Sequence, residues 1–191
     1  MKSVCLVLSV VLMSLATVAA AQSEGYKPVD KPALTDAQKS FTLLKNLAGI
    51  WQASVTTDPP LADMGNGTRT QVTMRVTSRG NGLVHEIYEP DKPDDPTKYD
   101  HPLTMLYMDG DRLLLTHYCD AGNRPRMVAR TSPDGKTVEF DFLDLSGGTQ
   151  YGHMDHAVFT VIDANHHTED WTCVMAGDKP LRAHLDLKRT K

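Results

Sequence analysis

The hydrophobic positions of the chain follow one spacing before residue 49 and a different spacing after it. Phe41, Leu44 and Leu47 are three residues apart, so a helix would carry their side chains on one stripe. Beyond residue 49 the helical spacing does not return, and apolar and polar residues alternate instead. The pattern therefore predicts one amphipathic helix followed by a long run of strands.

Capping residues set the limits of the predicted helix. Thr35 is a good N-cap, and Gln38, three residues later, completes a capping-box pattern. Gly49 is suited to the position just beyond the last turn, where a left-handed backbone ends many helices. The helix is expected over about residues 36–47.

Alternation and turn residues divide the rest of the chain into about ten strands. Val72, Met74 and Val76, for example, share one face of an extended chain. Asp-Gly and Asn-Gly pairs, which suit hairpins, separate many of the segments. The predicted strands cover residues 50–57, 68–78, 83–89, 103–108, 112–119, 126–132, 137–145, 153–162, 168–175 and 180–190.

Short turns between successive strands favour an up-and-down antiparallel arrangement. An open sheet of this length would leave two exposed edges, and closure into a barrel removes them. We therefore predict an all-β protein, an up-and-down antiparallel β-barrel of about ten strands preceded by one N-terminal amphipathic helix. A two-sheet sandwich is the alternative, because strand counting does not separate the two.

The first residues have the features of a secretory signal peptide. Lys2 precedes a long apolar run, and the small residues at 19–21 form a cleavage site. The expected organisation is a signal peptide over residues 1–21, a disordered leader over 22–34 and a single barrel domain over 35–191. The predicted location is the periplasm or the outside of the cell.

The mature chain is acidic, and its charges are scattered. Without the signal peptide it would carry 19 Lys and Arg residues against 24 Asp and Glu, a net charge of −5. This balance argues against nucleic acid as a partner and against binding to anionic membranes after cleavage. The oligomeric state is left open.

The start of the predicted barrel resembles the lipocalin and calycin superfamily. A helix leads into Gly49-x-Trp51, and in those barrels the tryptophan closes the base. The segments "LLLTHYCDAGNRPRM" and "GHMDHAVFTVIDANH" resemble a group of uncharacterised secreted bacterial barrel proteins. These resemblances imply a lipocalin-like fold and bring no known activity.

The C-terminal segment is similar to the last strand of nitrobindin-type barrels. "MAGDKPLRAHLDLKR", residues 175–189, contains the comparable His-Leu pair. The resemblance implies that His184 takes the place of the proximal haem ligand and that haem is the alternative cofactor. The alternation leaves open whether His184 or its leucine neighbours point inward.

The segment around His117 carries the candidate ligand site. His117 and Cys119 share a face with two leucines, and Arg126 follows across the turn. Polar groups near the mouth of an apolar cavity are the usual layout of a small-ligand site. Trp171 is the predicted stacking wall and Trp51 the closure of the far end. In the competing interpretation His117 is an ordinary core residue, and Cys119 is a small core side chain or is bridged to Cys173.

Metal and catalytic motifs give little support to other functions. A cross-strand set such as His85, His117 and His156 stays open, but the chain has no HExxH and no other metal-ligand spacing. The neighbouring carboxylates Glu169 and Asp170 read as solvated strand positions. P-loop, GxGxxG and Gly-x-Ser-x-Gly patterns are absent, so no catalytic residue and no metal ligand are assigned.

The sequence thus predicts a secreted or periplasmic barrel that binds an apolar or amphipathic small molecule without transforming it. A haem- or metal-dependent redox barrel that uses His184 or a cross-strand histidine set is the alternative.

Overall fold

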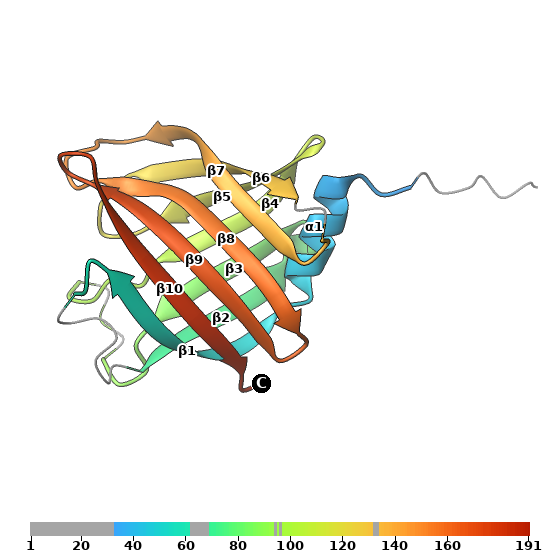
Figure 1. The fold of residues 1–191 in the computed structure, drawn as a ribbon, viewed down its shortest axis with the longest axis horizontal. Coiled ribbons are helices and arrows are strands. Elements are labelled where there is room, and N and C mark those ends of the chain that lie inside the picture. Colours follow the sequence, from blue (N-terminus) through green and yellow to red (C-terminus); the bar gives the residue numbers. More distant parts are fainter. Residues whose placement is uncertain (1–32, 62–68, 94, 96, 132–133) are drawn as a thin grey trace, which may run out of the picture. The chain divides into compact units, whose positions relative to one another are not determined.

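The computed structural model describes residues 33–61, 69–93, 95, 97–131 and 134–191. These residues form one α-helix, one turn of 3-10 helix and ten strands, and the strands close into an antiparallel barrel (Figure 1). The barrel prediction is confirmed. The predicted signal peptide and most of the predicted leader lie outside the described residues. No helix in the described part of the chain is long and apolar enough to cross a membrane.

Most of the elements follow one another with short connections, and longer segments lie between residues 58 and 70 and between residues 88 and 103. The elements are α1 (Asp36–Lys45), β1 (Gly49–Asp58), β2 (Thr70–Thr77), η1 (Ser78–Gly80), β3 (Gly82–Tyr88), β4 (Leu103–Asp109), β5 (Arg112–Tyr118), β6 (Arg124–Thr131), β7 (Thr137–Ser146), β8 (His153–Asp163), β9 (His166–Met175) and β10 (Lys179–Arg189).

Each strand pairs with the next one along the chain, and the first pairs with the last. The closing pair β1–β10 runs from Trp51 opposite Arg189 to Asp58 opposite Arg182. No edge is left unpaired in the strand order, which is the property that favoured a barrel over a sandwich. Because successive strands are antiparallel, all odd-numbered strands run from the α1 end of the barrel towards the opposite end.

Helix α1 forms where the capping residues predict it and covers one end of the barrel. The Thr35 side chain accepts a hydrogen bond from the backbone N–H of Gln38, and the Gln38 side chain accepts one from the backbone N–H of Thr35. Phe41 and Leu44 are buried beneath the helix. Figure 1 shows α1 lying across the ends of the strands, near β4 and β6.

The helix is shorter than predicted, and Gly49 has a different role. The last helical residue is Lys45, and Gly49 is the first residue of β1. Its φ is +151°, and a Cβ there would lie 2.3 Å from Nη1 of Arg189 and 2.5 Å from the carbonyl oxygen of Lys191. A side chain at this position would therefore collide with the end of the last strand.

Arg189 ties the helix to the end of the chain. Its guanidinium donates hydrogen bonds to the carbonyl oxygens of Ala48 at 2.7 Å and Asn46 at 3.1 Å. A third bond, at 2.8 Å, reaches the carbonyl oxygen of Ala164. The same group lies 4.1 Å from the Trp51 ring centre, within reach of a cation–π interaction.

Side chains fill the interior at the α1 end. Large apolar residues from the helix and most of the strands form one cluster, and the bulkiest of them have no exposed surface: Trp51, Phe140, Phe159, Leu44, Leu83, Leu106, Leu113, Leu115, Met127 and Leu187. We call this the sealed end. Any bound molecule must therefore lie nearer the opposite end.

The opposite end, which we call the mouth, carries the loops that follow β3, β5, β7 and β9. Asn123 is buried there, and its side-chain N–H group donates to the carbonyl oxygens of Gly148 and Gly152 at 2.9 and 2.6 Å. It thereby fixes the loop after β7 against the loop after β5. Phe142 alternates with buried Phe140 on β7 and is 38% exposed, so burial along this face of β7 decreases towards the mouth.

Candidate functional site

Five polar or aromatic side chains meet inside the barrel between the sealed end and the mouth. Three strands supply this interior polar cluster, which consists of His85 of β3, His117 of β5, and His167, Glu169 and Trp171 of β9. Each has at most 3% of its surface exposed. Buried polar groups at this density are unusual and need an account of their partners.

Glu169 is the centre of the cluster. Its carboxylate accepts hydrogen bonds from Nε2 of His85 at 2.9 Å, Nε2 of His167 at 3.0 Å and Nε1 of Trp171 at 3.0 Å. Burial by itself would raise the pKa of Glu169. The charge of His85 and the hydrogen bonds from both imidazoles outweigh burial and hold this pKa far below its usual range. Glu169 is therefore a carboxylate in the folded protein.

His117 lies beside His85 and against the same indole. The rings of His117 and His85 are both 5.7 Å from the Trp171 ring centre and are tilted by 43° to it. Nδ1 of His117 is 2.9 Å from the hydroxyl oxygen of Thr104. Burial, and then the nearby charge of His85, lower the pKa of His117 to about 4, so this imidazole is neutral at physiological pH.

Three imidazole nitrogens of the cluster are buried and have no hydrogen-bond partner among the described residues. They are Nδ1 of His85, Nε2 of His117 and Nδ1 of His167, and His167 lies against Trp51 at the sealed end. Leaving a buried polar atom unpaired costs about 1–3 kcal/mol. The other nitrogen of each ring is held by Glu169 or Thr104, which fixes the orientation of the three rings. The nitrogens of His85 and His117 can therefore receive a polar group.

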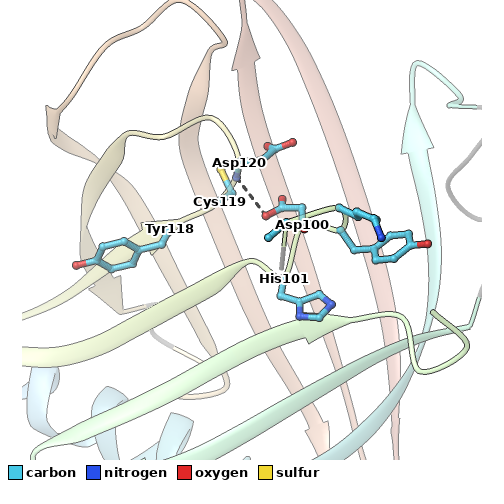
Figure 2. A pocket seen from close by; sticks show the side chains of 8 residues that line it. Asp100, His101, Tyr118, Cys119 and Asp120 are labelled. Carbon is cyan, nitrogen blue, oxygen red and sulfur yellow. Dashed lines mark hydrogen bonds between the residues drawn. The ribbon is translucent and has the colours of Figure 1, made fainter. Parts of the chain in front are cut away.

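A pocket of about 530 Å³ lies at the mouth, between the loops that follow β3 and β5 (Figure 2). It is lined by Thr97, Lys98, Tyr99, Asp100, His101, Tyr118, Cys119 and Asp120. The backbone N–H of Asp120 donates to the Asp100 carboxylate at 3.1 Å. Burial and the neighbouring Asp120 charge raise the pKa of Asp100. Two carboxylates held this close make the rim of the mouth acidic.

The two cysteines of the predicted mature chain lie in the same part of the barrel. Cys119 and Cys173 are free thiols, and both are half-buried. Burial is the largest cause that raises the pKa of both thiols, and the charges of nearby carboxylates that include Asp120 add to it. The neighbouring Cys119 also raises the pKa of Cys173. The Cys173 thiol donates to the sulfur of Met175 at 3.6 Å. Protonated thiols are poor nucleophiles, so the raised pKa values make both cysteines weak nucleophiles.

The structure brings some of the predicted ligand residues together and separates others. His117 and Trp171 lie in one layer of the interior, and Cys119 follows His117 towards the mouth. Arg126 is half-exposed and forms an ion pair with Asp144, with Nε 2.7 Å from the carboxylate. Its cross-strand partner Thr116 alternates with the inward-facing His117, so Arg126 points outward.

Trp51 lies at the sealed end, away from the mouth. It has no exposed surface, and its Nε1 donates to the carbonyl oxygen of Leu47 at 2.8 Å. Its ring meets that of His167 edge to face, with the centres 4.2 Å apart. Trp51 is not among the residues that line the mouth pocket.

His184 lies on the outer surface of the barrel. Its side chain is 46% exposed, and Nδ1 is 2.7 Å from the Asp170 carboxylate. The leucines of the same strand, Leu185 and Leu187, are the inward residues. The sequence left open whether His184 or its leucine neighbours point inward. In the structure the leucines point inward and His184 points away from the interior.

Sequence reasoning missed the centre of the cluster. Glu169, which was expected at a solvated strand position, is completely buried, and three histidines are buried with it. The alternation of β9 held a signal: Trp171 and Cys173 share a face with residues 167 and 169. Of the suggested cross-strand histidine set, His85 and His117 lie together.

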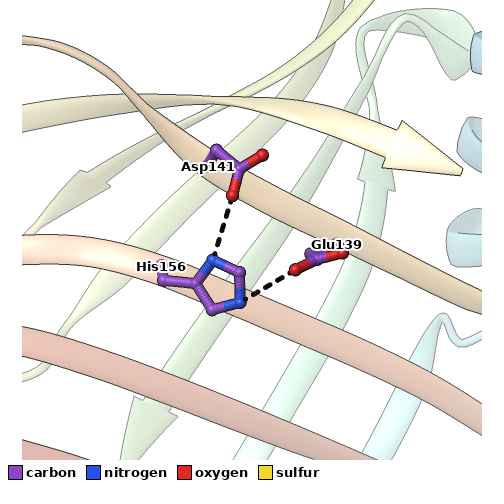
Figure 3. Close-up of side chains that lie close together, drawn as sticks. All are labelled: Glu139, Asp141 and His156. Atoms are coloured by element: carbon purple, nitrogen blue, oxygen red, sulfur yellow. Dashed lines mark ion pairs between the residues drawn. The ribbon is translucent and has the colours of Figure 1, made fainter.

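His156, the third member of that suggested set, belongs to a different group. Its Nε2 is 3.4 Å from the Glu139 carboxylate and its Nδ1 is 3.3 Å from that of Asp141 (Figure 3). The guanidinium of Arg130 also pairs with both carboxylates. Arg130, His156 and the two carboxylates thus form one group on strands β6, β7 and β8, apart from the interior cluster.

Fold and cluster define a closed ten-stranded antiparallel β-barrel with a polar layer of imidazole, carboxylate and indole groups in its interior. Neither a protein-family model nor a curated protein matches the chain. Among solved structures, it is similar to a protein of unknown function from the DUF3598 family of Nostoc punctiforme. The TM-score is 0.48 at 10% identity, and the match covers 77% of this chain and 49% of the other. The chain thus spans about half the length of that neighbour.

Proposed function

We propose that the protein is a secreted or periplasmic binding protein that holds a small amphipathic molecule between the interior polar cluster and the mouth. The observation that carries this proposal is the pair of buried nitrogens, Nδ1 of His85 and Nε2 of His117, without partners among the described residues. A polar group of the ligand would pair with them and remove the cost of leaving them unpaired.

The surroundings of the two nitrogens suit the rest of such a molecule. Trp171 offers an aromatic face beside both imidazoles. Ile87 and Met154 pack on the core, and Phe142 and Leu181 follow the inward alternation of β7 and β10 towards the mouth. Mostly apolar walls with a few convergent polar groups are typical of small-molecule sites.

The test is recovery of the ligand. The mature chain is purified under native conditions, small molecules are released gently, and mass spectrometry identifies them. We expect one molecular class in wild type and in the control His184→Leu, and its loss in His117→Leu. His117→Gln, which keeps a partner for Thr104, serves where the leucine variant is unstable. The same small molecules in wild type and both His117 variants would overturn the proposal.

The haem or metal alternative predicts a different result from the same preparation. Purified wild-type protein would show a Soret band or a stoichiometric metal. With His184 on the outer face, the interior donors for such a group are His85 and His117, so the signal would disappear in His117→Leu and persist in His184→Leu.

A further inference from the structure

Three sulfur-bearing side chains gather on the inner face of the sheet at the mouth. Cys173 and Met175 follow the buried Trp171 at intervals of two residues along β9, so they share its inward face. Met154 of β8 is the register partner of Cys173, and its side chain packs against the apolar core. Cross-strand partners have Cβ atoms about 4.5–5.5 Å apart, so the Met154 thioether is within reach of the Cys173 thiol. We call these three residues the sulfur group.

Two sulfur atoms of this group are separated by the distance that two ligands of one metal ion have. Sγ of Cys173 lies 3.6 Å from Sδ of Met175. Two sulfur atoms that each lie about 2.3 Å from one metal ion, at a tetrahedral angle, are about 3.8 Å apart. The methionine side chain is unbranched and flexible. The pair can therefore hold one ion with only a small adjustment of Met175.

The donor types select the class of metal ion. Thiolate and thioether sulfurs are soft ligands that favour Cu(I), whereas carboxylate and carbonyl oxygens suit Mg²⁺ and Ca²⁺. A metal ion bound by Cys173 takes the place of the thiol proton, which is released to solvent. The charges of Asp120 and Asp155, which help to raise the pKa of this thiol, also attract a cation to it.

The sulfur group has access to solvent on the side of the mouth. Met175 is 41% exposed, and Cys173 is half-buried. Trp171, the next inward residue of β9 towards the sealed end, is buried. An ion can thus reach the sulfur atoms from the mouth and find an apolar side chain beneath them.

From the Sγ–Sδ distance and the cross-strand position of Met154, we propose that Cys173, Met175 and Met154 form a binding site for a soft monovalent cation, Cu(I). The site uses none of the histidines of the interior polar cluster. The proposal therefore does not rest on the proposed function, and it differs from the haem or metal alternative, whose interior donors are His85 and His117.

The experiment measures Cu(I) binding to the mature protein, under ascorbate and without oxygen, in competition with the chromogenic chelator ferrozine. We expect wild type to bind one equivalent. Cys173→Ser, which removes the thiolate, should lower the affinity at least about a hundredfold. Met175→Leu and Met154→Leu keep the apolar volume and should each lower it about three- to tenfold.

Two matched controls lie outside the sulfur group. Cys119→Ser makes the same change at the other free, half-buried thiol. Met105→Leu makes the methionine change on β4, where Met105 alternates with the buried, inward Leu106 and so lies on the outer face. Both variants should bind Cu(I) as wild type does. Where Cys173→Ser does not fold, the two methionine variants of the sulfur group carry the test.

The results that would overturn the proposal are distinct. Equal losses in Cys119→Ser and Cys173→Ser would indicate a site of two thiols instead of a thiol and thioethers. Wild-type affinity in both Met175→Leu and Met154→Leu would mean that the thioethers are not ligands. Zn²⁺ bound as tightly as Cu(I), with the same dependence on Cys173, would contradict the selection of a soft monovalent ion.

Discussion

At the scale of single residues, the partners of Glu169 show why part of the site could be predicted and part could not. Alternation along one strand correctly placed His117 on the leucine face. Two donors to the Glu169 carboxylate, His167 and Trp171, are two residues away on the same strand, and alternation places them on its face. The third donor, His85, lies on β3, 84 residues earlier in the chain, and the pattern of one strand does not contain it.

His117 makes stability depend on pH. Its pKa is about 4 in the folded protein, against an ordinary value of 6.5, so on acidification the unfolded chain takes up this proton first. The free energy of unfolding should therefore fall by about 3 kcal/mol between pH 6.5 and pH 4 from this group. The lowered pKa of Glu169 adds a further loss as acid protonates its carboxylate in the unfolded chain.

Urea unfolding at pH 7 and pH 4.5 checks this prediction. The difference in unfolding free energy between the two conditions should shrink in His117→Leu and persist in His184→Leu, whose imidazole is exposed. An equal difference in wild type and His117→Leu would mean that another group causes the acid sensitivity.

At the scale of elements, the local sequence pattern predicted the helix and the strands, but it did not predict where the helix ends and β1 begins. The capping box starts α1 at the expected residue, while tertiary contacts set its end. Gly49 was expected to stop the helix, but the close approach of Arg189 and Lys191 makes it the start of β1. Such an approach joins residues about 140 positions apart and leaves no trace in the local sequence.

The apolar stripe of α1 should account for most of its contribution to stability. Leu44 has no exposed surface and belongs to the core cluster, so Leu44→Ala should lower the free energy of unfolding by about 2–5 kcal/mol. Thr42→Ala, on the exposed face of the same helix, should change it by less than about 0.5 kcal/mol. Urea midpoints measure both, and similar effects in the two variants would contradict the burial of the stripe.

At the scale of the whole molecule, closure of the sheet joins the two ends of the domain. Strand counting predicted ten strands and left barrel and sandwich open, because the first-to-last pairing is a property of the assembled sheet. That pairing places the end of β10 beneath the end of α1, where Arg189 bonds three backbone carbonyl groups.

Arg189 should stabilise the fold through the geometry of its hydrogen bonds as well as through its charge. A lysine cannot reproduce the forked bonds to Asn46 and Ala48, so Arg189→Lys should lower the unfolding free energy by about 1–3 kcal/mol. Arg182→Lys makes the same change on the same strand, where the ion pair to Asp58 is exposed and long at 3.9 Å. Thermal unfolding compares the two, and equal shifts would count against a clamping role for Arg189.

The backbone carbonyl of Lys191 accepts a hydrogen bond from the N–H of Ile50 at 2.9 Å, beside the helix that closes the barrel. A linker attached after this residue would leave the molecule on the side away from the mouth. Protein immobilised through such a linker on a sensor chip or bead would present the mouth to the solution. The proposed binding function could then be tested on immobilised protein without obstruction by the support.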